Sequence, residues 1–134
     1  MDKYLTHVSV VDRLVEEWTT HRDKFIIAFD YDDTVFDYNK SGHTYDKVIG
    51  LLHRCQNIGA YFICFSCSQP QRYPEMREYL DSRNIPVDTI NGDAPHATRT
   101  DDRKPQFNIL LDDRAGLSES VFILDTVCDI MEAQ

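Results

Sequence analysis

The chain has 134 residues, which suits one compact domain, and 42% of them are hydrophobic, enough to build a buried core. This composition excludes intrinsic disorder, and the formal net charge of −9 argues against stable binding to duplex DNA, which proteins contact through many Lys and Arg side chains. The N-terminal stretch lacks the pattern of a secretory signal and the apolar runs are too short to span a membrane, so we expect a cytoplasmic protein.

The first third of the chain predicts two helices separated by a strand and a loop. Apolar residues spaced three or four apart predict an amphipathic helix over about residues 6–20. The apolar run Phe25–Phe29 predicts a strand, and the polar and aromatic residues of 31–43 predict a loop. We expect Thr44 to cap a second helix, which ends before Gly59.

The rest of the chain continues this alternation of strands and helices. The apolar runs Tyr61–Phe65 and Phe107–Leu111 predict strands, and a shorter strand is expected at Val87–Ile90. Apolar spacing predicts a helix over about residues 74–83, with Pro74 in its first turn, and a final helix over about 117–131.

Three of the predicted strands are apolar throughout, which is typical of strands buried on both faces of a parallel sheet. We therefore expect an α/β fold: a Rossmann-like three-layer α/β/α sandwich with a mostly parallel sheet, formed by residues 1–134 as a single domain. In such sheets, ligands bind beyond the carboxyl ends of the strands. The residues that follow the strands are therefore the candidates for chemistry.

Acidic residues follow the first and the last long strands. Asp30, Asp32 and Asp33 come after the first, and Asp112 and Asp113 come after the last. Because the carboxyl ends of parallel strands meet at one edge, we expect these carboxylates to gather there. Clustered carboxylates are tolerable when a divalent cation neutralises them, and Mg²⁺ prefers oxygen ligands. The sequence therefore predicts a Mg²⁺ site.

Two other polar residues are expected near the same edge. Ser66 follows the second strand and would donate a neutral hydrogen bond to a phosphoryl oxygen. Lys104 precedes the last long strand and would add a positive charge for a phosphoryl group or for the nucleophile. Both side chains fit a site that binds a small anion together with a metal ion.

These motifs, in this order, resemble the haloacid dehalogenase superfamily, in particular a compact capless subgroup from phages and bacteria. "IIAFDYDDTVF" resembles its first motif, an apolar strand followed by Asp-x-Asp-x-Thr, and "FICFS" resembles its second, an apolar strand ending in Ser or Thr. Lys104 stands for the third motif, and "NILLDDRAG" resembles the fourth, an apolar strand ending in paired acids. The resemblance covers about residues 25–116.

The resemblance implies a Mg²⁺-dependent phosphatase that hydrolyses phosphate monoesters through an aspartyl-phosphate. Asp30 would be the nucleophile, and Asp32 would protonate the leaving oxygen and then deprotonate a water. Ser66 and Lys104 would complete the catalytic set. The implied metal ligands are Asp30, the backbone carbonyl of Asp32, Asp112 and Asp113. The implied substrate contacts are Thr34, which would also brace the loop, Ser66 and Lys104.

The sequence departs from the family pattern at two places. Asp33 stands where the first motif often has Gly, and Lys104 lies only eight positions before Asp112, too close for a full helix between them. The intervals between the motifs also leave no room for a substantial cap domain. An open site of this kind would accept a phosphorylated small molecule or a polynucleotide end. Four other cations could contact it, although each is more typical of a solvated surface: Arg72, His96, Arg99 and Arg114.

Three alternatives explain parts of the pattern. A phospho-receiver or other non-catalytic Mg²⁺- and phosphate-binding module would have a similar size and charge, but receiver domains place their Lys after the acids, whereas Lys104 precedes Asp112. An EF-hand loop would need Gly where Val35 stands. A zinc knuckle would need a second pair like Cys64 and Cys67, and Cys64 is better explained as a buried strand thiol.

Overall fold

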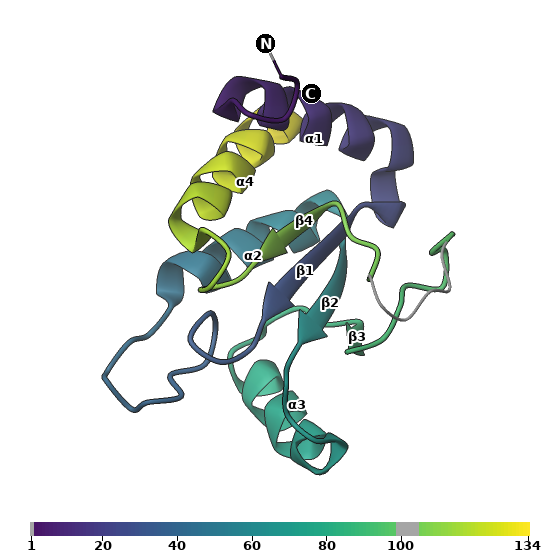
Figure 1. The fold of residues 1–134 in the computed structure, drawn as a ribbon. Coiled ribbons are helices and arrows are strands. Elements are labelled where there is room, and N and C mark those ends of the chain that lie inside the picture. The colour runs from purple at the N-terminus through teal and green to yellow at the C-terminus, as the bar shows by residue number, and fades with distance from the viewer. Residues whose placement is uncertain (1, 99–104) are drawn as a thin grey trace.

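The computed structural model describes residues 2–98 and 105–134 (Figure 1). In chain order, its elements are α1 (His7–His21), the 3₁₀ turn η1 (Arg22–Lys24), β1 (Ile26–Asp30), α2 (Asp46–Ile58), β2 (Tyr61–Phe65), the 3₁₀ turn η2 (Pro70–Arg72), α3 (Tyr73–Ser82), β3 (Thr89–Ile90), β4 (Ile109–Leu111) and α4 (Leu117–Glu132). None of the helices in these ranges is long and apolar enough to cross a membrane.

The four strands form one parallel sheet in the order β3-β2-β1-β4. The arrows of β1 and β2 point toward the end of the molecule where the loop after β1 lies (Figure 1). The predicted α/β fold with a parallel sheet flanked by helices is therefore confirmed. The chain leaves β1 toward β2 on one side, whereas β4 lies on the other side of β1. The carboxyl ends of β1 and β4 thus flank the topological switch point, where such sheets bind ligands.

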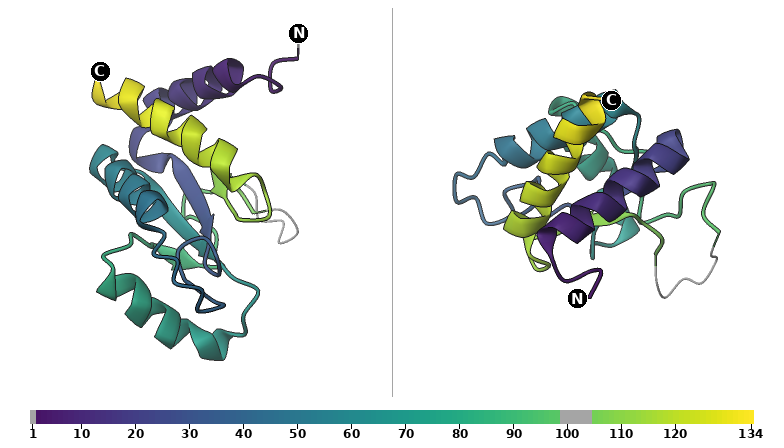
Figure 2. Two further views of the ribbon diagram at one scale, coloured as in Figure 1. Left: turned by 90° about the vertical axis from the view of Figure 1, so that its left-hand side faces the viewer. Right: turned by 90° about the horizontal axis from the view of Figure 1, so that it is seen from above.

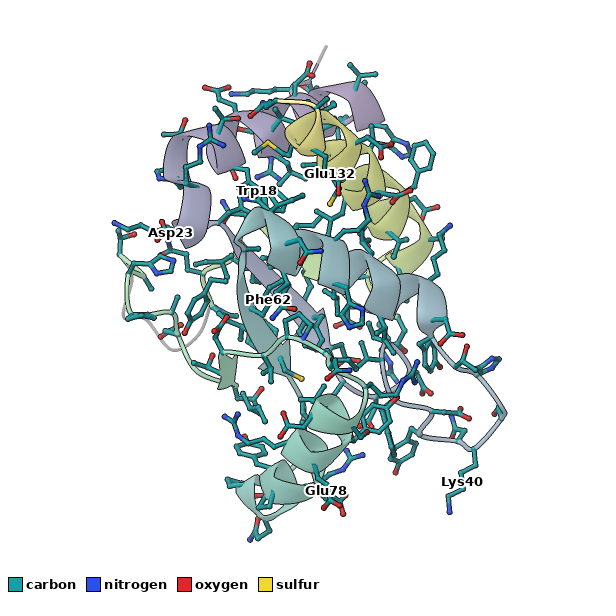
Figure 3. All side chains as sticks on the ribbon, turned by 180° about the vertical axis from the view of Figure 1, so that it is seen from behind. Trp18, Asp23, Lys40, Phe62, Glu78 and Glu132 are labelled. Atoms are coloured by element: carbon teal, nitrogen blue, oxygen red, sulfur yellow. The ribbon has the colours of Figure 1, made fainter. Side chains whose placement is uncertain are left out.

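The helices pack on one face of this sheet. Ile27 and Phe29 of β1 and Phe62 of β2 belong to the larger of two hydrophobic clusters, and every buried helix residue in the described ranges belongs to it too. Figure 3 views the molecule from this side and labels Trp18, which stacks on Phe25 with ring centroids 4.3 Å apart. The terminal helices α1 and α4 pack against each other on this side (Figure 2).

The opposite face carries the smaller cluster, formed by alternate strand residues such as Ala28 and Ile63. Ala94 and Phe107, from the connection between β3 and β4, pack against them. Right-handed crossovers place α2 and α3 on one face and send the return from β3 to β4 across the other. In the described parts of that return, residues 91–98 and 105–108, the layer is an irregular segment where the three-layer prediction expects a helix.

The ends of two helices depend on specific residues, one of which the sequence predicts. The Thr6 side chain caps α1 by accepting a hydrogen bond from the Ser9 N–H at 3.1 Å. Gly59 ends α2 as predicted, with a left-handed φ of 103°. The predicted Thr44 cap is wrong: α2 begins one residue later, after Tyr45, which has a φ of 56° and makes no side-chain capping bond.

Candidate functional site

The site lies at the switch point and begins with three carboxylates. Phe29 of β1 pairs with Leu111 of β4, so Asp30 and Asp112 follow side by side at the ends of neighbouring parallel strands. Asp30, Asp112 and Asp113 each offer a carboxylate oxygen, and these three atoms lie within 4.8 Å of one another. We call these three residues the acidic triad. Its hard oxygen donors are chemically suited to Mg²⁺.

The acidic triad has an unfavourable electrostatic energy when it stands alone. Burial, a side-chain hydrogen bond with Asp113 and the nearby charges of Asp112, Asp113 and Asp32 raise the pKa of Asp30 to about 7. Each cause disfavours the ionised form of Asp30. A divalent cation among the three carboxylates would reverse this effect, because a bound ion is the largest local charge in such a site.

Thr34 contacts one member of the triad, Asp113. Its side chain is fully buried, and its hydroxyl accepts a hydrogen bond from the Asp113 N–H at 3.1 Å and donates one to Asp113 Oδ1 at 3.4 Å. These contacts connect the turn after β1 to the turn after β4, in keeping with the bracing role expected for Thr34. The hydroxyl is therefore directed at Asp113, and Thr34 does not line the pocket described next.

The turn after β1 also explains the unusual residue before Thr34. The N–H groups of Val35 and Phe36 both donate to the Tyr31 carbonyl, and this tight turn places Asp33 at a φ of 58°. Glycine adopts this left-handed conformation most easily, and Asp and Asn are among the few other residues that tolerate it. Asp33 therefore occupies a position whose backbone geometry favours Gly.

A pocket of about 600 Å³ opens above the triad. Its lining residues come from the end of β1 and from the segments that follow β1, β2 and β4: Asp30, Asp32, Asp33, Tyr38, Cys67, Ser68, Arg72, Asp112, Asp113 and Arg114. The pocket thus combines five carboxylates with two guanidinium groups. This composition suits a ligand that contains both a cation and an anion, such as a phosphate group bound together with a metal ion.

Asp32 lies in this pocket but is not a member of the triad. Its carboxylate accepts two hydrogen bonds from Arg72, from Nη1 at 2.8 Å and from Nη2 at 2.9 Å. In the sequence, Arg72 is more typical of a solvated surface cation, and its pairing with Asp32 is not predicted. The available signal was positional, because Arg72 falls in the turn after β2 and therefore near the same edge of the sheet.

The remaining candidates have different surroundings. Ser66 follows β2 as predicted, but its Oγ accepts a hydrogen bond from the Ser68 N–H at 3.0 Å, and its neighbours Cys67 and Ser68 line the pocket in its place. His96 Nε2 lies 3.0 Å from the Lys24 carbonyl oxygen, outside the pocket. Lys104 and Arg99 lie outside the described residues. Cys64 is buried in β2, as predicted.

A scan against protein-family models matches no family, and searches of curated proteins and of solved structures return no match.

Proposed function

We propose that this protein is a Mg²⁺-dependent phosphatase that hydrolyses phosphate monoesters through an aspartyl-phosphate on Asp30. The observation that carries the proposal is the acidic triad, whose three carboxylate oxygens lie within 4.8 Å of one another at the switch point of the sheet. Its motifs resemble those of haloacid dehalogenase-type phosphatases, and the order of strands around the triad is compatible with that resemblance.

The triad would hold the magnesium ion through Asp30, Asp112 and Asp113. Carboxylate groups from two neighbouring strand ends leave the pocket side open, and Mg²⁺ usually keeps positions for water and phosphate oxygens. When bound, the ion would supply positive charge that neutralises the carboxylates and attracts the phosphoryl group. Thr34 would maintain the orientation of Asp113 through its two hydrogen bonds.

The proposed reaction has two steps, each with its own proton transfer. In the first, a carboxylate oxygen of Asp30 forms a bond to phosphorus, the bond to the ester oxygen breaks, and Asp32 gives that oxygen a proton. In the second, Asp32 takes a proton from a water whose oxygen attacks phosphorus, and the bond to Asp30 breaks to release phosphate. A covalent intermediate divides one difficult displacement into two easier ones.

The surroundings of the pocket indicate which esters could reach it. The chain between β1 and β2 forms only α2, and the described chain between β2 and β3 forms only η2 and α3, so these segments contain no substantial cap domain. The substrate would be a phosphorylated small molecule or a polynucleotide end. Stable binding to duplex nucleic acid is not expected from a chain of net charge −9.

The test is a phosphate-release screen over many monoesters, with Mg²⁺ and with a chelator. Asp30→Asn should lower kcat on the order of 10⁴-fold or more, because it removes the nucleophile while keeping the shape of the side chain. Asp33→Asn is the matched control, since it makes the same charge change in the same pocket. Wild-type hydrolysis by Asp30→Asn would refute the proposal. A stable acyl-phosphate without phosphate release would favour the receiver-like alternative.

A further inference from the structure

Arg72 has the contacts of a preformed anion-binding group. Besides its two hydrogen bonds to Asp32, Nη1 donates to Ser68 Oγ at 2.6 Å, and Nε donates to Glu75 Oε1 at 3.3 Å. A guanidinium has five N–H donors. These four contacts therefore leave one Nη2 donor without a partner among the described residues, at the pocket to which Arg72 belongs.

Aromatic rings hold this guanidinium in place. Arg72 Cζ lies 5.2 Å from the ring centroid of Tyr31, 5.7 Å from that of Phe36 and 5.7 Å from that of Tyr38. Tyr31 and Phe36 stack on each other, and the ring of Tyr79 from α3 meets both edge-on. Cation–π contacts of this kind fix a guanidinium without consuming its N–H donors.

The carboxylate of Asp32 occupies the donors that a phosphate would use. Arginine recognises carboxylate and phosphate with the same pair of parallel N–H groups, so the two anions compete for one site. The negative charge of Asp32 is thus compensated, whereas the described side chains give the acidic triad no cationic partner. An incoming phosphate could exchange with Asp32 while the aromatic rings keep Arg72 in position.

We propose that Arg72 is the phosphate-binding residue of this pocket and that an arriving phosphoryl group displaces Asp32 from it. The proposal rests on the proposed function and deepens it, because it couples substrate binding to the release of Asp32. In the free protein, Asp32 is held by Arg72. Once phosphate takes its place, Asp32 is able to turn toward the leaving oxygen.

The test measures the affinity of inorganic phosphate by calorimetry with saturating Mg²⁺, so no turnover is needed. Arg72→Met should weaken binding roughly 10- to 100-fold, as expected for lost charge-assisted hydrogen bonds. Arg72→Lys should retain only part of the wild-type phosphate affinity, because an ammonium cannot donate two parallel hydrogen bonds to a phosphate. Arg83→Met is the control: Arg83, at the end of α3, also pairs with an aspartate, Asp46 at the start of α2, but lies outside the pocket.

The proposed displacement of Asp32 predicts that removing its charge strengthens phosphate binding. Asp32→Asn should tighten phosphate binding by more than Asp33→Asn, which removes the same charge from the same pocket without freeing Arg72. The excess should vanish in the double variant Asp32→Asn/Arg72→Met, because the coupling then has no second partner. If the ion pair between Asp32 and Arg72 had only a structural role, Asp32→Asn and Arg72→Met would each lower the Tm. Asp32→Asn would then tighten phosphate binding no more than Asp33→Asn does.

These outcomes separate this proposal from the proposed function. Wild-type phosphate affinity in Arg72→Met, equal effects of Asp32→Asn and Asp33→Asn, or no phosphate binding by the wild type would each overturn the role of Arg72. Ester hydrolysis is measured on the same samples. If the wild type hydrolyses esters but Arg72→Met binds phosphate as the wild type does, the phosphatase proposal stands and the role of Arg72 is wrong. If the variants change phosphate affinity as predicted but no ester is hydrolysed, the role of Arg72 in binding anions stands and the phosphatase proposal is wrong.

Discussion

The two sides of the pocket differ in how their charges are balanced. On one side, Asp32 is paired with Arg72, and aromatic rings and Ser68 fix the guanidinium. On the other side, Asp30, Asp112 and Asp113 form no ion pair with any cationic side chain of the described ranges, although Arg114 lines the same pocket. The charge of Asp32 is thus balanced within the protein, whereas no such ion pair balances the triad. Under our two proposals, the acidic side would bind a metal ion, and the paired side would bind an anion in exchange for Asp32.

Removing the metal should have the largest effect on stability. If the acidic triad binds Mg²⁺, an ion concentration 100-fold above Kd adds about 2.7 kcal/mol to the free energy of unfolding, which corresponds to roughly 10 °C in Tm for a chain of this size. Asp112→Asn should remove most of this gain, and Asp33→Asn should keep it. Thermal unfolding with Mg²⁺ or a chelator checks both. Equal gains in the two variants would show that the ion binds elsewhere.

In the absence of metal, the acidic side of the pocket should make the stability of the protein depend on pH. Asp30 has a pKa of about 7 in the folded protein, raised from 3.8, so the folded state holds a proton that the unfolded state releases. This contribution to stability is fully present below pH 3.8 and is lost as the pH rises through about 7. In chelator, the free energy of unfolding attributable to Asp30 should therefore fall from about pH 4 to about pH 7 and level off above that.

Denaturant unfolding of the wild type and of Asp30→Asn measures this contribution. The variant cannot titrate at this position, so its stability should fall less steeply over the same interval. Added Mg²⁺ should stabilise the wild type more at pH 8 than at pH 5, because the ion competes with the proton for Asp30. Parallel pH profiles for the two proteins would contradict the raised pKa.

Thr34→Val tests the brace beneath the triad. Valine keeps the shape but leaves the Asp113 N–H without its acceptor, which should cost about 0.5–1.5 kcal/mol of unfolding free energy. Because Asp113 is then less well oriented, the Mg²⁺-dependent gain in Tm should also shrink. Thr34→Ser keeps the hydroxyl and should retain that gain. If Thr34→Val binds Mg²⁺ like the wild type, Thr34 does not orient the triad.

The sequence predicted those features that depend on burial and on the ends of strands. The apolar runs identified β1, β2 and β4, and the acids that follow β1 and β4 do lie together. Such features are predictable because a buried parallel strand needs apolar side chains on both faces. The carboxyl ends of parallel strands then necessarily meet at one edge of the sheet.

The features that were missed depend on contacts between distant or irregular segments. Arg72 and Asp32 are 40 residues apart, and only the folded turns bring them together. The Thr44 cap failed because the left-handed Tyr45 begins α2 instead, a backbone choice that propensity does not reveal. The described part of the connection between β3 and β4 covers one face of the sheet as an irregular segment, with Ala94 and Phe107 as its apolar contacts.

The smallest expected effect concerns Asp33, which borders the acidic side without belonging to the triad. Its φ of 58° is a conformation that costs a non-glycine residue about 1–2 kcal/mol. Asp33→Gly should remove part of that strain, but it also gives up hydrogen bonds from Asn39 at 3.5 Å and Tyr45 at 3.4 Å. We expect a net stabilisation below about 1 kcal/mol in chelator, measured by denaturant unfolding. Asp33→Ala, which loses the same contacts without relieving the backbone, should be less stable than Asp33→Gly. If the alanine variant is the more stable one, the contacts of Asp33 rather than its backbone explain why this turn tolerates an acid.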